Sequence, residues 1–430
     1  MMNNTMNIIR RVSNTFIPWV KQNNIKQLNI NKASNVFIYN DKRKIVDFTS
    51  GAMAVNLGHN NSYILDGFNN HIKTGISYVP SNFSTYERDK LSSRIIEHTH
   101  KKGKVFFTNA GADANECAIF TAQEYFNLSG SKKSRVISFN KSFHGGSTIG
   151  ASLISGDKRL ENKDKFYKLS LEPIMENPNM EDKGKASLKQ IEKLLQNDVC
   201  AIIIEGSSGS AGCILYPKDY LKKLEKLCNK YNVLIICDEV MSGWGRTGSL
   251  FAYQKHDINP DIITTAKGIT SGYSPLGAVI INEKVSDIFN DNPLMYGLTY
   301  SGHILPCTIA NRCFDLYTNN YYEIIRNTYE KTDIIEKMCN NIFLKYPFIK
   351  DFRNNGMLGC FEIDNYNNKL LERICFELLN NNIYCLRIRN NIFIAPPLII
   401  DNEILIDTLD KIDMIFEKIL NIGIYNEYYR

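Results

Sequence analysis

Two ionisable residues of complementary chemistry follow apolar, strand-like runs in this chain. Lys267 comes directly after residues 262–266, and Asp238 follows residues 233–237. Ligands of open parallel sheets bind beyond the carboxyl ends of the strands. A lysine in such a cleft would have a lowered pKa and could attack a carbonyl group to form a Schiff base. Taken alone, Lys267 is more typical of an exposed lysine, and Asp238 of a helix N-cap or an ion-pair partner.

Residues 108–116, Thr-Asn-Ala-Gly-Ala-Asp-Ala-Asn-Glu, form a turn of small residues where a strand-like run passes into a helical pattern. Backbone N–H groups at such a helix start, including those of Gly111 and Ala112, are free to bind phosphate, and the helix dipole assists them. A plain tight turn with Asn109 or Asp113 as the N-cap is the alternative.

An aromatic side chain, a histidine and a valine complete this set. Phe143 is of the type that stacks on a planar ring, and Val240 could pack on the other face, although either residue could equally belong to the core. His144 follows an aromatic residue in a glycine turn, which favours a structural role or a hydrogen-bond bridge over a catalytic base. With a phosphate cup and a lysine nearby, Asp238 would hold a pyridinium nitrogen protonated and make the ring an electron sink.

Short apolar runs alternate with helical patterns between residues 104 and 281. The runs are 104–108, 135–139, 201–204, 233–237, 262–265 and 277–281. Their β-branched composition predicts strands buried on both faces, and the amphipathic helix at 220–231 predicts a parallel, right-handed connection. Polar or glycine-rich segments follow five of the runs: 109–113, 143–146, 205–206, 238–239 and 267–268. We therefore expect five strand ends to meet at one site of an α/β fold.

The two ends of the chain predict a second, smaller α+β unit. Helical patterns at 311–345 and 402–420 alternate with strand-like residues 357–363 and 392–394, and residues 36–48 are typical of a hairpin that could pack on this unit. The predicted division is an N-terminal segment 1–60 that belongs to the small domain, a large cofactor-binding domain 61–310, and a C-terminal small domain 311–430.

The composition is that of a globular protein. The chain has 430 residues and a formal net charge of +6 without blocks of like charge, so we expect no nucleic acid partner. It has no apolar stretch of membrane-span length, so we expect a soluble protein. Its eleven cysteines lie in apolar or helical segments and form no C-x-x-C pair, which indicates reduced core residues and a cytoplasmic location. We expect no metal site. Basic residues precede the first acidic residue, Asp41, but the many asparagines there disfavour an organelle transit peptide.

The quoted segments resemble one family along nearly the whole chain, from about Thr15 to the C-terminus. The sequence is similar to the class III, or omega, aminotransferases, which have fold type I and use pyridoxal 5′-phosphate. The matching segments are 106–116, 143–145, 238–248, 266–268 and 299–303. Residues 16–19 and 266–278 are most similar to the pyruvate-using branch, which includes taurine–pyruvate and omega-amino acid–pyruvate enzymes. The resemblance implies a large domain with a mostly parallel, seven-stranded type of sheet and a smaller α+β domain built from both termini.

The resemblance also implies roles for individual residues. Lys267 would carry the cofactor and move the proton, Asp238 would bond to the pyridine nitrogen, and Phe143 would stack on the ring. Gly111 and Ala112 would bind the phosphate through backbone N–H groups. The remaining predicted cofactor contacts are His144, Glu205, Val240 and Thr299.

The resemblance further implies a homodimer, because Thr299 would reach the phosphate from the neighbouring subunit. Several residues depart from the family pattern. Ala112 stands where many relatives have Ser or Thr, which removes one hydroxyl contact to the phosphate, and Gly206 replaces the usual Pro after Glu205. Phe393 stands where ornithine-type relatives carry a glutamate-binding arginine, which disfavours an ornithine or GABA substrate.

Two positions are candidates for substrate contacts. Met53 sits where many omega enzymes have a tryptophan in the pocket. The pyruvate-using branch has a mobile arginine that binds the acceptor carboxylate, and Arg387 or Arg389 lies in that region. We favour Arg387, with a surface arginine in a loop as the alternative.

The predicted reaction is the transfer of an amino group from an omega-amino acid or amine to a keto acid, with pyruvate favoured, by a ping-pong mechanism. A decarboxylase, racemase or aminomutase would share every residue named above and is the alternative. A catalytically silent homologue with a binding or structural role would be expected to have lost Lys267 or Asp238, and both are present.

Overall fold

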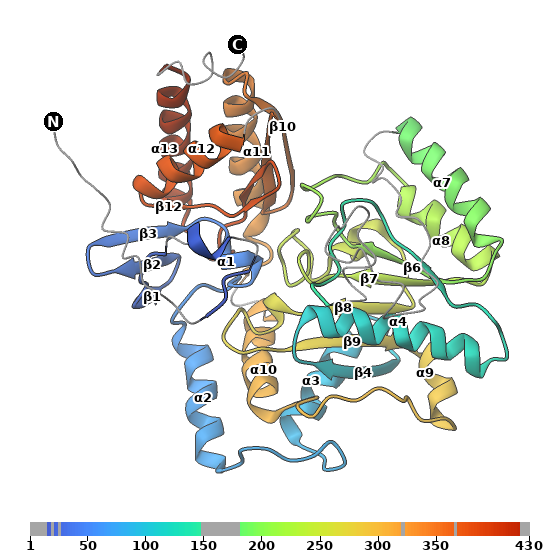
Figure 1. Ribbon diagram of the computed structural model, residues 1–430. Coiled ribbons are helices and arrows are strands. Elements are labelled where there is room, and N and C mark those ends of the chain that lie inside the picture. Colours follow the sequence, from blue (N-terminus) through green and yellow to red (C-terminus); the bar gives the residue numbers. More distant parts are fainter. Residues whose placement is uncertain are drawn as a thin grey trace.

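The computed structural model of the chain describes residues 15–18, 21–24, 27–147, 181–319, 323–364 and 368–421. Figure 1 shows the middle of the chain folded into a large α/β part. The blue N-terminal strands lie beside the orange and red C-terminal elements in a smaller part. None of the helices in the described ranges is long and apolar enough to cross a membrane.

A six-stranded sheet organises the large part in the described ranges. Its strands are β4 (Gly103–Thr108), β5 (Arg135–Ile137), β6 (Val199–Glu205), β7 (Leu234–Asp238), β8 (Ile262–Thr265) and β9 (Gly277–Asn282). They are hydrogen-bonded in the order β4-β9-β8-β7-β6-β5. Strands β5 to β8 are parallel to one another, whereas β9 runs antiparallel to both of its neighbours. The connection between β8 and β9, residues 266–276, contains a short 3-10 helix at Lys267–Ile269 but no crossover α-helix, as is typical of an antiparallel pair.

Both faces of the central sheet are covered, as the continuous apolar runs predict. On β6, Ile202 and Ile204 belong to one buried cluster, and Ala201 and Ile203 belong to another on the opposite face. Helix α4 (Gly111–Leu128) covers the second face, whereas α7 (Glu181–Leu195) and α8 (Tyr220–Lys230) pack into the first cluster. The expected helix at 220–231 and the expected α/β class are confirmed.

Further helices surround this sheet. They are α1 (Ser50–Met53), α2 (Ser62–Thr74), α3 (Tyr86–Glu97), α9 (Glu283–Ser286) and α10 (Ile304–Thr318), with the 3-10 turns η1 (Gln22–Asn24), η3 (Ala252–His256), η4 (Lys267–Ile269) and η5 (Asp287–Asn290). Helix α10 packs against α2 and α3. The single helical segment predicted at 311–345 is two helices, because α10 ends at Thr318 and the next helix, α11, starts at Thr328.

The smaller part combines both ends of the chain. Its C-terminal elements are α11 (Thr328–Lys345), α12 (Asn368–Asn380), α13 (Asn402–Asn421), β10 (Ile349–Asn355), β11 (Leu358–Ile363), β12 (Ile383–Tyr384), β13 (Arg387–Ile388) and β14 (Asn391–Ile394). The N-terminal strands are β1 (Lys32–Ser34), β2 (Phe37–Asn40) and β3 (Arg43–Asp47). The predicted hairpin is confirmed, and β3 pairs in parallel with β12. The predicted domain limits of 60 and 310 stay predictions.

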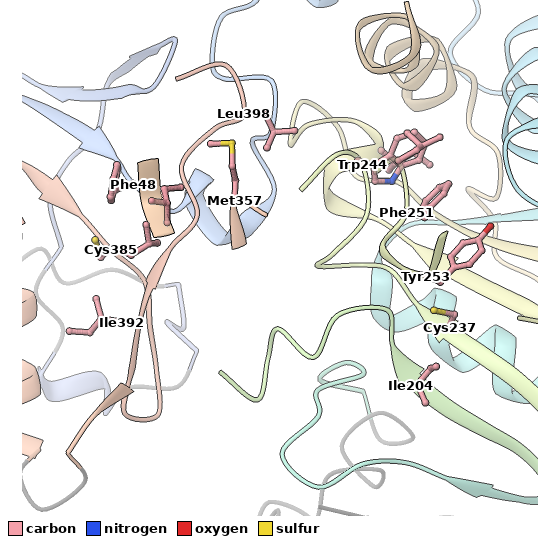
Figure 2. Close-up of a cluster of buried hydrophobic side chains, with 14 of the residues drawn as sticks. Phe48, Ile204, Cys237, Trp244, Phe251, Tyr253, Met357, Cys385, Ile392 and Leu398 are labelled. Carbon is pink, nitrogen blue, oxygen red and sulfur yellow. The ribbon is translucent and has the colours of Figure 1, made fainter. Parts of the chain in front are cut away.

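One buried hydrophobic cluster runs through both parts of the molecule. Figure 2 shows some of its members, including Trp244 and Phe251 from the large part and Phe48 from the smaller part. The Trp244 ring stands edge-on to that of Phe251, with 5.3 Å between the centroids. All eleven cysteines are unpaired, ten of them buried and Cys375 half-buried, as the sequence predicts.

Candidate active site

A cavity of about 510 Å³ lies at the carboxyl ends of the central strands. All five segments that the sequence singles out contribute to its walls. The lining residues discussed below are Gly111, Ala112, Asn115, Phe143, His144, Glu205, Ser210, Asp238, Val240 and Lys267. Residues that are far apart in the chain therefore line one cavity at the carboxyl ends of the strands, where α/β sheets bind ligands.

Lys267 begins η4, two residues after Thr265 at the end of β8, and its side chain is half-buried at the cavity. Its backbone has a φ of 48°, a left-handed conformation that costs free energy for a residue with a side chain. Burial lowers the pKa of the Lys267 amine, although the negative charges of Asp238 and Glu205 oppose this shift. A lysine of lowered pKa can act as a nucleophile and as a proton carrier near neutral pH.

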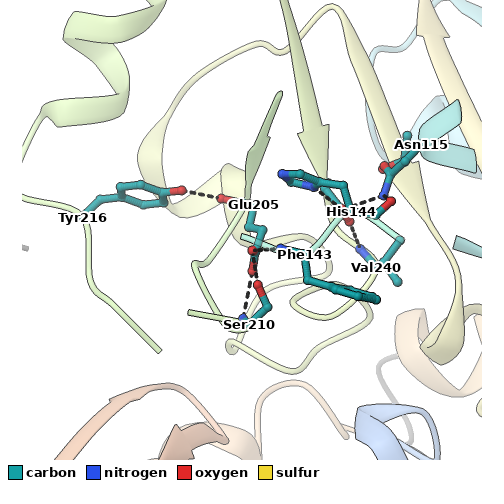
Figure 3. Close-up of polar contacts among 9 residues, drawn as sticks. Asn115, Phe143, His144, Glu205, Ser210, Tyr216 and Val240 are labelled. Carbon is teal, nitrogen blue, oxygen red and sulfur yellow. Dashed lines mark hydrogen bonds and ion pairs between the residues drawn. The ribbon is translucent and has the colours of Figure 1, made fainter. Parts of the chain in front are cut away.

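Asp238, the last residue of β7, is held by three donors. The side-chain amide of Asn115 donates to its Oδ2 atom at 2.7 Å, and His144 Nδ1 lies 2.8 Å from the same oxygen. The Val240 N–H donates to Oδ1 at 2.9 Å (Figure 3). Asn115 is itself fixed, because its Oδ1 accepts the Thr264 hydroxyl at 2.6 Å. The carboxylate therefore has a defined orientation before any ligand binds.

His144 links Asp238 to Asn115, in agreement with a structural role. Its ring is buried, and its carbonyl oxygen accepts the Asn115 amide at 3.0 Å. The second ring nitrogen, Nε2, has no hydrogen-bond partner among the described residues.

Glu205 lines the cavity from the end of β6, beside Asp238 on the neighbouring strand β7. Its carboxylate accepts the Phe143 N–H at 3.2 Å and the Ser210 N–H at 3.0 Å, and the Ser210 hydroxyl also donates to it (Figure 3). Burial raises the pKa of Glu205, while its bonds to Ser210 and the nearby His144 oppose the rise. The side chain thus fixes the backbone that carries the partly exposed ring of Phe143.

The start of α4 has the features of an anion site. Its N-cap is Ala110, whose side chain forms no capping hydrogen bond; the carboxylate of Asp113 accepts the N–H of Asn109 at 3.3 Å. A side chain on Gly111 is excluded, because an added Cβ would lie 2.8 Å from both methyl groups of Val240. The backbone at Gly111 and Ala112 can therefore approach a phosphate closely.

Three predicted residues lie outside the walls of this cavity. Thr299 is exposed, and its carbonyl oxygen accepts the Tyr78 hydroxyl at 2.9 Å. Met53 is buried in a separate hydrophobic cluster with Cys213 and Phe393. Their roles stay predictions.

The third of these residues is Arg387, whose hydrogen-bond partners also lie outside the cavity walls. It donates to the Asn368 side chain and to the Arg389 carbonyl, each at 2.9 Å. Arg389, in contrast, donates to the Lys141 carbonyl at 3.0 Å, and its guanidinium interacts electrostatically with Glu205. The arginine nearer to the cavity is therefore Arg389.

Sequence reasoning missed Asn115 and Ser210. Asn115 interrupts the buried, apolar face of α4, and a polar residue at such a position requires a hydrogen-bond partner. That pattern could have indicated its role. Ser210 lies in an irregular loop with no local signal, so its bond to Glu205 depends on the tertiary fold.

Glu239 is completely buried directly after Asp238, and burial raises its pKa to about 7. Its carboxylate accepts the Ser242 hydroxyl at 2.6 Å and the Tyr253 N–H at 2.7 Å. Because this pKa lies above the unfolded value, the contribution of Glu239 to stability is complete below pH 4.5 and is lost as the pH rises through 7.

We expect this carboxyl group to lower the free energy of unfolding by roughly 2 kcal/mol between pH 5 and pH 8. In urea unfolding, Glu239→Gln should remove this part of the pH dependence of the free energy of unfolding. A variant with the same pH profile as the natural chain would show that Glu239 does not titrate in this range.

The comparisons with known proteins agree with this geometry. The profile of the family described as "Aminotransferase class-III" matches residues 19–416. The acetylornithine aminotransferase of Oceanobacillus iheyensis is 31% identical, over 80% of this chain and 82% of that protein. The adenosylmethionine-8-amino-7-oxononanoate aminotransferase of Staphylococcus aureus is 30% identical, with the same coverage of 80% and 82%.

Solved structures give the same result. The taurine:2-oxoglutarate aminotransferase of Bifidobacterium kashiwanohense, in complex with PLP and glutamate, is 29% identical, with a TM-score of 0.87 over 94% of this chain and 95% of that one. An amine transaminase from an uncultivated Pseudomonas species has a TM-score of 0.88 over 94% and 99% of the two chains, at 22% identity, which supports the fold alone. The chain therefore belongs to the class III aminotransferases, the pyridoxal-phosphate-dependent enzymes that its strand-end lysine and aspartate indicate.

Proposed function

We propose that this enzyme moves an amino group from an omega-amino acid or amine donor to pyruvate, in two half reactions of a ping-pong mechanism. The observation that carries the proposal is the meeting of Lys267 and Asp238 on one cavity, at the ends of the adjacent strands β8 and β7. The similarity of residues 16–19 and 266–278 to the pyruvate-using branch supports the choice of acceptor.

The residues of the cavity fit pyridoxal 5′-phosphate. The uncapped start of α4 suits the phosphate, and Asp238 presents a fixed carboxylate to a pyridine nitrogen. Phe143 and Val240 both line the cavity and supply apolar surface for a ring. When bound, the cofactor supplies an electron sink for the substrate carbon next to the transferred nitrogen.

Lys267 is the residue that we assign to covalent attachment and to proton transfer. Its lowered pKa leaves more of the amine unprotonated at neutral pH than an exposed lysine would have. Asp238 keeps a proton on the ring nitrogen, and Asn115 and His144 hold the carboxylate in place for that task. The Glu205–Phe143 bond keeps the stacking ring at the cavity.

We further propose a cytoplasmic homodimer in which Thr299 completes the partner's site. Large apolar side chains are exposed on α2, α3 and the loops beside them: Ile72, Phe83, Tyr86, Met295 and Tyr300. Such a surface on a globular protein is typical of an interface. Analytical ultracentrifugation should give twice the mass of the chain, and a stable monomer with full activity would contradict the shared site.

For the acceptor carboxylate we propose Arg389 in place of Arg387, because Arg389 is bonded to the segment that leads to Phe143. Arg389→Leu should raise the KM for pyruvate about 10-fold to 100-fold, since a charge-assisted hydrogen bond contributes about 1.5–3 kcal/mol. Arg387→Leu is the matched control and should change this KM less than about threefold, as expected for an arginine outside the site. Steady-state kinetics with pyruvate would decide, and equal effects of the two substitutions would refute the assignment.

A panel of donors tests the proposed reaction. Taurine, β-alanine, putrescine and an aromatic amine are each incubated with pyruvate, and alanine is measured; parallel reactions contain 2-oxoglutarate, with N-acetylornithine as a further donor. Alanine formed from at least one omega donor supports the proposal. Glutamate formed from N-acetylornithine alone would contradict it, and no transfer by the cofactor-loaded enzyme would favour a decarboxylase, racemase or aminomutase.

A further inference from the structure

Arg246, in the loop after β7, is a buried cation that the proposed reaction does not use. Its side chain is completely buried, and it forms no ion pair with a carboxylate in the part of the chain that the structure describes. Its Nε atom has no hydrogen-bond partner among those residues. A buried charge without a counterion is unfavourable, so a functional role would explain why Arg246 occupies this position.

The guanidinium joins three stretches of the chain. Nη1 donates to the carbonyl oxygens of Met357, at 3.2 Å, and of Pro396, both in the C-terminal part. Nη2 donates to the hydroxyl of Ser50 at 3.0 Å and to Asn56 Oδ1 at 2.6 Å, in the N-terminal part. Arg246 therefore connects the loop after β7 to the N-terminal segment of Ser50 and Asn56 and to the C-terminal part of the chain.

This junction lies against the catalytic lysine. The Asn56 amide that bonds to Arg246 also donates to the Trp244 carbonyl at 3.0 Å. A Cβ added at Gly268, the neighbour of Lys267, would lie 2.7 Å from Asn56 Nδ2 and 2.7 Å from Trp244 Cβ. Figure 2 shows Trp244 and Met357, which belong to two of the joined stretches. A continuous set of contacts therefore leads from Arg246 to the turn that carries Lys267.

We propose that Arg246 is a positioning residue of this active site. Its guanidinium fixes the turn of Lys267 through Asn56, and its positive charge, which forms no ion pair with a carboxylate of the described residues, disfavours protonation of the Lys267 nitrogen. The inference rests on the proposed role of Lys267 and adds to it a source of electrostatic control from outside the cavity.

The charges around both groups agree with this role. Burial and Arg246 lower the pKa of Lys267, whereas Asp238 and Glu205 raise it. Of these two carboxylates, Asp238 faces His144, and Glu205 faces Arg389. Arg246 is therefore the charged side chain that acts with burial, and against both acids, on the lysine.

The groups that face Arg246 are Asp47 and Tyr317. Asp47 acts on Arg246 through space and forms no direct ion pair with it; its carboxylate accepts the Gly51 N–H at 2.6 Å and lies 3.6 Å from His59 Nε2. Tyr317 donates its hydroxyl to the Gly268 carbonyl at 2.9 Å, and burial raises the pKa of that phenol, so it stays neutral. The positive charge of Arg246 is therefore offset only at a distance, by Asp47, and the charge acts on Lys267.

The test compares Arg246→Met, which removes the charge, with Arg246→Lys, which keeps it. The rate at which an amine reagent labels Lys267 is measured against pH by peptide mass spectrometry on the full chain before cofactor is added. The visible absorbance of the cofactor-loaded enzyme is titrated in parallel. We expect the midpoint of both titrations to move to higher pH in Arg246→Met and to stay near the natural value in Arg246→Lys.

Lys331→Met is the matched control, because Lys331 is also buried at the junction and donates to the Leu398 carbonyl at 2.7 Å. It should lower stability without moving either midpoint. Should Arg246→Met fail to fold, Asn56→Asp replaces it, since a carboxylate at Asn56 Oδ1 would neutralise the guanidinium in place and raise the midpoint. An unchanged midpoint in Arg246→Met, or a shift in Arg246→Lys or Lys331→Met as large as the one in Arg246→Met, would overturn the inference. Labelling or cofactor attachment that misses Lys267 in the natural chain would instead overturn the proposed function.

Discussion

Replacing Lys267 by alanine should reduce transamination by at least about 10³-fold, because the enzyme would lose both its covalent attachment point and its proton carrier. The cavity should still bind the cofactor through α4 and Asp238, since neither depends on the lysine side chain. Steady-state alanine formation measures the first effect, and equilibrium dialysis with pyridoxal 5′-phosphate measures the second.

Lys267→Arg is the control for this prediction. It keeps a positive charge at the cavity, but a guanidinium is always protonated and cannot exchange a proton near neutral pH. We expect it to be as inactive as the alanine variant. Activity above about one-tenth of the natural value in either variant would show that another residue moves the proton.

Asp238→Asn should lower kcat by about 10²-fold to 10³-fold, because a neutral amide cannot hold the ring nitrogen protonated. The substitution also places an amide opposite the Asn115 donor, which approaches Asp238 Oδ2 at 2.7 Å. The rate of the first half reaction, followed in a single turnover with excess amine donor, measures the effect without interference from the acceptor.

Thr264→Val separates the charge of Asp238 from its orientation. The Thr264 hydroxyl holds Asn115 Oδ1 at 2.6 Å, so its removal loosens the carboxylate but leaves the charge. We expect a loss of about tenfold or less, the equivalent of one neutral hydrogen bond. If Thr264→Val were as inactive as Asp238→Asn, geometry alone would account for the role of Asp238.

Local sequence signals were sufficient for the elements that build the cavity. Runs such as 201–204 and 233–237 are apolar because both faces of the sheet are covered. The residues after them are polar because the site lies at the carboxyl ends of the strands. The sequence also indicated that the backbone at Gly111 can approach a ligand closely. The structure agrees, because a Cβ added at Gly111 would lie 2.8 Å from both methyl groups of Val240.

Features that depend on pairing across the fold were not accessible in this way. The antiparallel direction of β9 follows from its connection to β8, which an apolar run does not encode. Arg387 and Arg389 are two residues apart, and only the hydrogen bonds to Asn368 and Lys141 distinguish them. The environment of Met53 likewise arises from β11 and β14, which are more than 300 residues away along the chain.

The most direct test of the central claim is the site of covalent attachment. The purified enzyme is loaded with pyridoxal 5′-phosphate, reduced with borohydride, digested and mapped by mass spectrometry. Our account predicts one labelled peptide, with the pyridoxyl group on Lys267, and a yellow protein before reduction. A colourless protein in excess cofactor, or a label on another lysine, would contradict it.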